Sequence, residues 1–334
     1  MKKIVSLILT LTLILGALTS CSNNASSSNS DTSSKSEPVA VRVLALKGPT
    51  GIGMAKMMDD SSKSEGSKYS FTIAGQPTEA VSAVAGGKVD IAAVPTNLAA
   101  TLYQRTEKGV KMLAVNTLGS LYILEKGNTI NSIKDLRGKT IYATGQGANP
   151  EYVLNFLLSK NGLTPGKDVT VEFKAEHSEL AALMAAGECV LGMLPEPNVS
   201  SAMAQNSELR IALNLNDEWN KVADSDSRLA MGCVIVNESF LKAHPTEVEN
   251  FMNELESSIK YASENPKDAG TLCETYGIVP KAALATKAIP NCNLTFLKGE
   301  QMKKSIEGYL NLLFSSNPAS VGGSVPDENF YFIK

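Results

Sequence analysis

One segment of the chain occurs twice, and its two copies lie 100 residues apart. Residues 79–97 read EAVSAVAGGKVDIAAVPTN and residues 179–197 read ELAALMAAGECVLGMLPEP, with no gap between matched positions. Each copy holds a run of small and apolar residues that ends at glycine and an apolar run that ends at proline, which predicts a helix and then a strand. Any two βαβ units share this outline, but the common spacing of Glu, Gly and Pro favours a true repeat. The matched residues are Glu79 and Glu179, Ala85 and Ala185, Gly87 and Gly187, and Pro95 and Pro195.

The similarity continues upstream of each copy. Strands are predicted at 71–74 and 171–174, and before them at 41–46 and 140–144. The earliest strand of each half leads into a glycine-rich turn. Each half therefore reads as strand, turn, helix, strand, helix and strand. Strands that alternate with helices predict an α/β fold of two lobes, each with a mainly parallel sheet flanked by helices.

Two extended segments are predicted to connect the lobes as hinge crossings. Residues 111–126 contain two strand-like runs that meet at Leu118-Gly119-Ser120, and residues 229–237 form a further extended run. Glycine gives the backbone local freedom at such crossings. The predicted lobes are residues 38–119 plus 237–334, and residues 120–236. A helix with an apolar stripe is predicted at 246–264, with Thr246 and Glu249 forming a capping box.

The first 20 residues are typical of a secretory signal peptide: a basic start at Lys2 and Lys3, an apolar run and two small residues before Cys21. The apolar run of about 15 residues is shorter than the roughly 20 that a membrane-spanning helix needs. The ending Leu18-Thr19-Ser20-Cys21 resembles a bacterial lipobox, which implies a lipid on Cys21 and an anchor on the extracytoplasmic face of the cell membrane. Residues 21–37 comprise this cysteine and a Ser/Asn-rich stretch, predicted to be a flexible tether.

Charge and residue counts exclude several other classes of protein. Of the 334 residues, 31 are basic and 34 acidic, so no basic surface predicts a nucleic-acid partner. With only two histidines and no clustered Cys and His, we expect neither a metal site nor a cofactor. Cys189 and Cys233 lie in apolar runs and are predicted as buried thiols, whereas Cys273 and Cys292 could be a disulfide or two free thiols. We expect a monomer.

Ligands of open parallel α/β sheets bind beyond the carboxyl ends of the strands. This rule selects the loops 47–51, 75–78, 95–97, 145–149, 176–178 and 195–198, which are predicted to face one shared cleft. Several members could instead cap helices or end strands, namely Thr50, Pro95, Asn149, His177 and Pro195. The predicted ligand-binding residues are Lys47, Gly48, Pro49, Thr50, Gly51, Gln76, Pro95, Thr96, Asn97, Gly145, Gln146, Gly147, Ala148, Asn149, His177 and Glu196.

Charges within these loops bear on the ligand. Lys47 and Glu196 would each need a partner in the cleft, which indicates a polar ligand with donor and acceptor groups. The turn at 47–51 offers backbone donors, but it lacks the GxxxxGK[ST] spacing of a P-loop. Trp219 could stack on a ring or cover the lobe edge, and the second is favoured.

The chain resembles the solute-binding lipoproteins of ABC importers, in the group associated with nitrate, sulfonates, taurine, thiamine-pyrimidine precursors and riboflavin. The resemblance spans about residues 41–265. Its carriers, in order, are 83–97, Ile133-Lys134-Asp135-Leu136-Arg137-Gly138-Lys139, Asn161-Gly162-Leu163 with Asp168-Val169, 181–197, and 240–245 before a long helix.

The resemblance implies a type II periplasmic-binding fold that closes on a small solute and delivers it to a permease in the membrane. The chain departs from the family where Cys189-Val190 replaces an acidic position, and only 6% of its residues are aromatic. These departures count against a large flat ligand such as riboflavin. Which solute binds stays open.

Two other classes of function have signatures that can be compared with this sequence. A related branch with this fold synthesises the thiamine pyrimidine with a clustered cysteine motif and iron, but no such cluster occurs in this sequence. The sequence also lacks the G-x-S-x-G motif that holds the serine nucleophile of many hydrolases, so no enzyme is predicted. A lipoprotein that senses its ligand and signals to a receptor is the other alternative to import.

Overall fold

The computed structural model describes residues 39–64, 66–224 and 226–334, and the compact unit runs from Pro38 to Lys334. The predicted signal peptide, Cys21 and tether lie outside the described residues. In the described part, no helix has both the length and the hydropathy of a membrane span.

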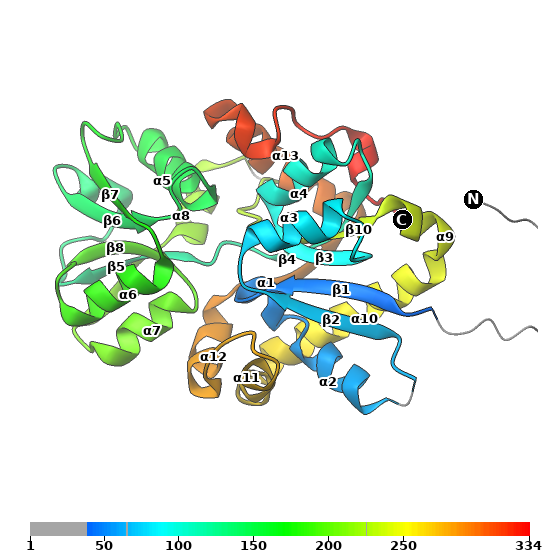
Figure 1. The fold of residues 1–334 in the computed structure, drawn as a ribbon. Coiled ribbons are helices and arrows are strands. Elements are labelled where there is room, and N and C mark those ends of the chain that lie inside the picture. The colour runs from blue at the N-terminus through cyan, green and yellow to red at the C-terminus, as the bar shows by residue number, and fades with distance from the viewer. Residues whose placement is uncertain (1–38, 65, 225) are drawn as a thin grey trace, which may run out of the picture. The chain divides into compact units, whose positions relative to one another are not determined.

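The first sheet has six strands in the order β11-β4-β10-β3-β1-β2 (Figure 1). Parallel pairing joins β1 to β2 and β3, and antiparallel pairing joins β10 to β3 and β4, and β11 to β4. Strands β1 to β4 therefore run in one direction. The strands are β1 (Val41–Leu46), β2 (Tyr69–Ala74), β3 (Ile91–Pro95), β4 (Val110–Thr117), β10 (Gly232–Asn237) and β11 (Leu294–Lys298).

The second sheet has five strands in the order β7-β6-β8-β5-β9. Strand β6 is parallel to β7 and β8, and β5 is antiparallel to β8 and β9, so β5 alone opposes the others in this sheet. The two sheets with their helices confirm the predicted α/β class. The strands are β5 (Leu121–Lys126), β6 (Thr140–Thr144), β7 (Thr170–Lys174), β8 (Leu191–Pro195) and β9 (Leu209–Asn214).

Successive residues along each strand pack into different apolar clusters, because their side chains point to opposite faces of the sheet. In β1, Val43 and Ala45 pack with helices α2 and α10, whereas Leu44 and Leu46 pack with α3, α4 and α13. Figure 1 shows these helices on opposite faces of the first sheet. The helices of this lobe are α1 (Pro49–Ile52), α2 (Ala55–Lys63), α3 (Pro77–Ala85), α4 (Thr96–Arg105), α9 (Glu238–Ala243), α10 (Pro245–Glu264), α11 (Pro266–Thr275), α12 (Ala282–Ala288), η2 (Ile289–Asn291), α13 (Gly299–Ser316), η3 (Pro318–Val321) and η4 (Glu328–Phe330).

The second sheet is covered in the same way. Tyr122 and Leu124 of β5 pack with α6 and α7, while Ile123 belongs to a cluster that includes α5 and α8 and continues into the first lobe. One apolar cluster therefore crosses from lobe to lobe. The helices here are η1 (Ile133–Leu136), α5 (Asn149–Lys160), α6 (His177–Ala186), α7 (Asn198–Gln205) and α8 (Leu215–Val222).

The duplicated segment forms the same structure in both lobes. Strands β3 and β8 occupy equivalent positions of the repeat, and helices α3 and α6 begin at the equivalent residues Pro77 and His177, just before it. Gly87 and Gly187, which follow the helices, both have positive φ angles, of 62° and 79°. Glycine adopts this conformation without steric cost, which explains why both copies carry it there.

The chain leaves the first lobe between β4 and β5 and returns between α8 and β10. The outward passage consists of Leu118, Gly119 and Ser120, as predicted from the glycine. The lobe boundary expected between residues 236 and 237 falls inside β10, a strand that pairs with β3 and β4 of the first sheet.

The predicted capping box at Thr246 is wrong. Helix α10 begins at Pro245, and its N-cap is His244, which makes no side-chain capping bond. Proline suits the first helical position because its fixed φ angle is helical and its missing N–H would have no partner there. Thr246 therefore lies inside the helix. The four cysteines in the described residues are buried free thiols, which confirms the prediction for Cys189 and Cys233.

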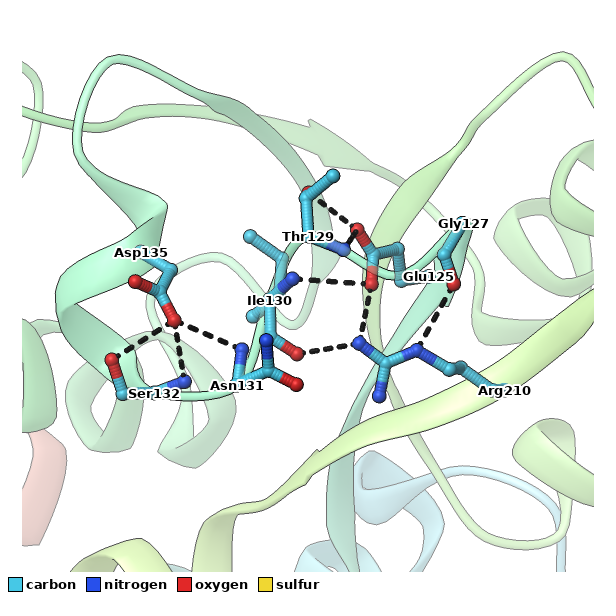
Figure 2. A network of polar contacts seen from close by, with 8 residues as sticks. All are labelled: Glu125, Gly127, Thr129, Ile130, Asn131, Ser132, Asp135 and Arg210. Carbon is cyan, nitrogen blue, oxygen red and sulfur yellow. Dashed lines mark hydrogen bonds and ion pairs between the residues drawn. The ribbon is translucent and has the colours of Figure 1, made fainter.

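A polar network stabilises the second lobe (Figure 2). The buried Glu125 carboxylate accepts hydrogen bonds from Thr129 N and Oγ1, at 2.8 and 2.6 Å, and from the Arg210 guanidinium at 2.7 Å. Arg210 also donates to the carbonyl oxygens of Gly127 and Ile130. Because Glu125 pairs with Arg210 at the end of β5, where β8 begins, this network lies at the amino ends of the parallel strands.

Candidate functional site

The carboxyl-terminal edges of the two sheets are joined by three residues. Gly232 pairs with both Pro95 and Thr117, so β3 and β4 end at the same edge of the first sheet. Leu121 pairs with Pro195, so β5 begins at the edge where β8 ends. Because only Leu118, Gly119 and Ser120 separate Thr117 from Leu121, the loops after the parallel strands of both lobes come together.

Polar side chains are buried at this junction. The first lobe and the crossing contribute Thr96, Asn116, Thr117 and Ser120, and the second lobe contributes Thr144, Asn149, Glu196 and Ser200. A polar side chain removed from water costs free energy unless it finds a hydrogen-bond partner. The partners of these groups therefore indicate which of them are available to a ligand.

The turn after β1 is held by backbone and by Asn116. Gly48 has φ 94° and its N–H donates to the Ile278 carbonyl at 3.3 Å. Asn116 Nδ2 donates to the Thr50 carbonyl at 3.2 Å, and Thr50 Oγ1 donates to the Leu46 carbonyl. Lys47 is exposed, Pro49 is the first residue of α1, and Gly51 is buried. A Cβ on Gly51 would lie 2.5 Å from the Leu46 carbonyl oxygen, so the turn requires glycine there.

Thr96 begins α4 directly after β3 and is fully buried. Its N–H donates to the Met231 carbonyl at 3.1 Å, which ties the loop to the return crossing. Its hydroxyl oxygen has no oxygen or nitrogen partner within the described residues, and the buried Cys233 thiol lies against it. The neighbouring Pro95 is the N-cap of α4, and the Asn97 carbonyl accepts from Thr101 Oγ1.

The glycine-rich turn of the second lobe is hydrogen-bonded to Glu151 and Tyr152 of α5, and Tyr152 is also bonded to the first lobe. Gly147 N donates to Glu151, and Tyr152 Oη donates to the Gly147 carbonyl at 3.0 Å. Asn317, which follows α13, donates to the same Tyr152 oxygen at 2.9 Å. The other predicted members are Gly145, with φ 75°, exposed Gln146, Ala148 as the N-cap of α5, and Asn149.

Asn149 is 5% exposed, and its Oδ1 is without a partner in the described part of the chain. It is the first residue of α5 and not its cap. Asn149 and Thr96 thus place one unsatisfied buried oxygen from each lobe near the junction.

His177 is the first residue of α6, and Glu176 is the N-cap. Its Nδ1 lies 2.6 Å from Thr144 Oγ1 in a hydrogen bond. Burial lowers the pKa of His177, against the opposing effect of the Glu176 charge, which favours a neutral imidazole at pH 7. Gln76 stands apart from this group: it is exposed and forms a capping box with Glu79 at the start of α3.

The Glu196 carboxylate is 1% exposed and already has protein partners: Ser200 N, Ser200 Oγ and Asn291 Nδ2. Burial raises the pKa of Glu196, and these bonds offset part of that rise. Trp219 is buried between Phe156 of α5 and Tyr309 of α13, with ring centroids 4.7 and 5.6 Å away, so its ring packs between a helix of each lobe.

Sequence reasoning missed Asn116, Thr117 and Ser120, although the pattern held a signal. These polar residues follow the apolar part of β4, where a buried strand would otherwise continue. Asn291 was also missed, and nothing near it in the sequence predicts its contact with Glu196. Among the described residues no group of three or more His, Cys, Asp or Glu is placed to hold a metal ion.

Solved structures share this fold. An ABC transporter structure from Parabacteroides distasonis is 25% identical, with 89% of this chain and 99% of that chain covered and a TM-score of 0.75. The periplasmic aliphatic sulphonate binding protein SsuA from Escherichia coli is 15% identical, with 87% and 92% covered and a TM-score of 0.68. The periplasmic nitrate-binding protein NrtA from Synechocystis PCC 6803 is 13% identical, with 71% of this chain and 66% of that chain covered and a TM-score of 0.51.

These similarities confirm the predicted two-lobe, type II periplasmic-binding fold. No curated protein sequence matches the chain. The family described as "NMT1/THI5 like" matches residues 63–269. Because this match covers more than half of the chain, the protein belongs to the NMT1/THI5-like family.

Proposed function

We propose that the protein is an extracytoplasmic solute-binding lipoprotein of an ABC importer. It captures a small organic or oxyanion solute of the sulfonate, nitrate or thiamine-pyrimidine type between its two lobes and delivers it to a membrane permease. The lobes are residues 38–119 with 237–334, and residues 120–236. The protein acts as a monomer and performs no catalysis. The names of the neighbours from Escherichia coli and Synechocystis support the sulfonate and nitrate classes.

One observation carries the proposal: each lobe presents a buried oxygen without a partner beside the junction. Thr96 Oγ1 comes from the first lobe and Asn149 Oδ1 from the second. An unsatisfied buried polar atom costs about 1–3 kcal/mol, and a solute that bonds to both oxygens would remove that cost. A solute that bonds to both would hold the lobes together, which is how a ligand shifts a protein toward its closed state.

The remaining loop residues complete the site in this proposal. The turn Lys47 to Gly51 supplies the Lys47 cation, because the N–H groups of Lys47, Gly48 and Gly51 already donate to protein carbonyls. The turn Gly145 to Asn149 supplies polar groups from the opposite lobe. His177, neutral at pH 7, presents either a donor or an acceptor depending on its tautomer. Such a mixed set suits a small solute with both donors and acceptors.

Thermal unfolding of the protein from residue 22 onward tests the ligand class, since a ligand that binds only the folded state raises the melting temperature. The panel contains alkanesulfonates, taurine, nitrate, aminopyrimidines and riboflavin. We expect stabilisation by a sulfonate, nitrate or a pyrimidine. No stabilisation by any member would contradict the proposal.

Thr96→Val tests the site itself, because valine matches threonine in shape but lacks the hydroxyl. We expect weaker binding of the stabilising compound by about 10-fold, with unchanged or increased stability of the free protein because an unsatisfied group is removed. Thr72→Val, at an exposed position of β2, is the matched control and should bind normally. Equal affinity of both variants would exclude Thr96 from the site.

Uptake separates import from sensing. Cells that lack the protein should lose uptake of the stabilising compound and regain it with the wild-type chain. Normal uptake without the protein would favour the sensing function instead.

A further inference from the structure

Asn291 of the first lobe makes two hydrogen bonds to the second lobe. Its Nδ2 donates to Glu196 Oε1 at 3.1 Å, and its carbonyl accepts from Tyr122 Oη at 2.7 Å. Asn291 ends η2, just before β11 of the first sheet, whereas Tyr122 and Glu196 belong to β5 and to the loop after β8. Helix α12 contacts α7 beside them. This group therefore spans the two lobes.

The Glu196 carboxylate is fully engaged by protein groups. Oε1 accepts from Ser200 Oγ at 2.9 Å as well as from Asn291, and Oε2 accepts from Ser200 N at 3.1 Å. The backbone N–H of Glu196 donates to the Ser120 carbonyl, which fixes the loop to the outward crossing. With 1% of its surface exposed, Glu196 has no face left for a solute.

We propose that Glu196 and Asn291 act as positioning residues that hold the lobes in the closed arrangement and so set solute affinity without touching the solute. The role in affinity rests on the proposed function, but the role in lobe closure does not. Because the Glu196 carboxyl group is buried, water does not compete for this bond. Separation of the lobes must break it and also the bond from Tyr122 to the Asn291 carbonyl.

Spin labels on the ligand-free protein measure closure directly. Single cysteines replace Ser70 on β2 and Ser159 on α5, both exposed, in the protein from residue 22 onward, which keeps the whole compact unit. Pulsed electron spin resonance then reports the distance distribution between the lobes. The four cysteines of the described residues are buried and should escape labelling.

Asn291→Asp is the sharpest variant, because it is nearly isosteric and sets a second carboxylate against Glu196. We expect a longer inter-lobe distance, or a new longer population, at pH 8. Tyr122→Phe removes the other bond and should lengthen the distance less. Asn311→Ala, at an exposed position of α13, should match the wild type. Circular dichroism establishes that each variant is folded.

Unchanged distances in both Asn291→Asp and Tyr122→Phe would overturn the closure role. The affinity role is tested with the compound that stabilises the wild type in the thermal panel. We expect Asn291→Asp to raise its dissociation rate at least about 10-fold, with the association rate changed much less. A lengthened distance with an unchanged dissociation rate would overturn the affinity role. A lengthened distance in a protein that binds no panel compound would refute the proposed function and leave the closure role intact.

Discussion

Thr96 and Glu196 occupy equivalent positions in the two copies of the repeat, yet Glu196 accepts three hydrogen bonds through its carboxylate and the Thr96 hydroxyl has none among the described residues. Each is buried and directly follows a strand of its lobe, β3 for Thr96 and β8 for Glu196. The duplicated scaffold thus places two residues alike but bonds them differently: Glu196 accepts a hydrogen bond from Asn291 of the other lobe, and the Thr96 hydroxyl has no such bond among the described residues.

Replacement of Arg210 should destabilise the second lobe. Arg210→Ala leaves the buried Glu125 carboxylate without its cation, so we expect a loss of about 3 kcal/mol in the free energy of unfolding, at the lower end for breaking a buried pair. The bonds from Thr129 and Ile130 remain and limit the loss. Urea denaturation followed by circular dichroism measures it.

Arg137→Ala is the matched control, because Arg137 is 58% exposed in its ion pair with Asp168. Removal of an exposed pair should cost less than about 1 kcal/mol. Equal losses in the two variants would contradict the structural role of the Glu125 network.

Lobe closure should depend on the titration of Glu196. Burial raises the pKa of Glu196 in the closed arrangement, and hydration on opening would return it toward the usual value, so closing takes up a proton. Closure is then favoured at low pH and weakened as pH rises through the raised pKa. The spin-label distance at pH 5 should therefore be shorter than at pH 8, or its long population smaller.

The other titratable groups near Glu196 do not account for this dependence. Burial raises the pKa of Tyr122 on β5 and of Cys292 after η2, so both stay neutral below pH 8. Ser200 and Asn291 carry no charge. Glu196→Gln should abolish the dependence, and Glu188→Gln, at an exposed site, should retain it. A pH-independent distance in the wild type would contradict the assignment.

Tyr309→Phe should leave stability unchanged or increase it. The Tyr309 hydroxyl is buried without a hydrogen-bond partner in the described structure, so its removal relieves a desolvation cost. Tyr309→Ala, in contrast, removes the ring that packs against Trp219 and should cost about 3–5 kcal/mol. Urea unfolding can be followed by fluorescence, since Trp219 is the one tryptophan of the sequence. A large loss in Tyr309→Phe would show that the hydroxyl has a partner.

Cys21 should carry the membrane anchor. Expression in a bacterial host with an alkyne fatty acid should label the wild-type chain, and Cys21→Ser should remain unlabelled and leave the membrane fraction. Cys189→Ser, which alters a buried thiol, should be labelled like the wild type. Labelling of Cys21→Ser would place the lipid elsewhere.

Local pattern was sufficient to predict much of the fold. Glycine and proline positions located the helices and strands of the repeat. These residues end a helix or strand through their own backbone geometry, which needs no contact with a distant residue. The outward crossing was predicted for the same reason. The insertion of β10 between β3 and β4 could not be predicted, because strand pairing depends on contacts between distant parts of the chain.

The candidate site was predictable in outline only. The rule for strand ends selected Thr96 and Asn149, which proved to be buried with unsatisfied oxygens. It also selected Gln76, which is exposed and caps the start of α3 together with Glu79. Whether Glu196 is free for a solute depends on Asn291, 95 residues away, and no local pattern contains that contact.

Gly119 links the two crossings more closely than their order in the chain suggests. A Cβ built on Gly119 would lie 2.7 Å from Leu229 Cδ2, in the return crossing, and 2.8 Å from Asn216 Cβ. The outward and return passages therefore lie against each other at this glycine. A larger residue at position 119 would push apart the two segments that connect the lobes.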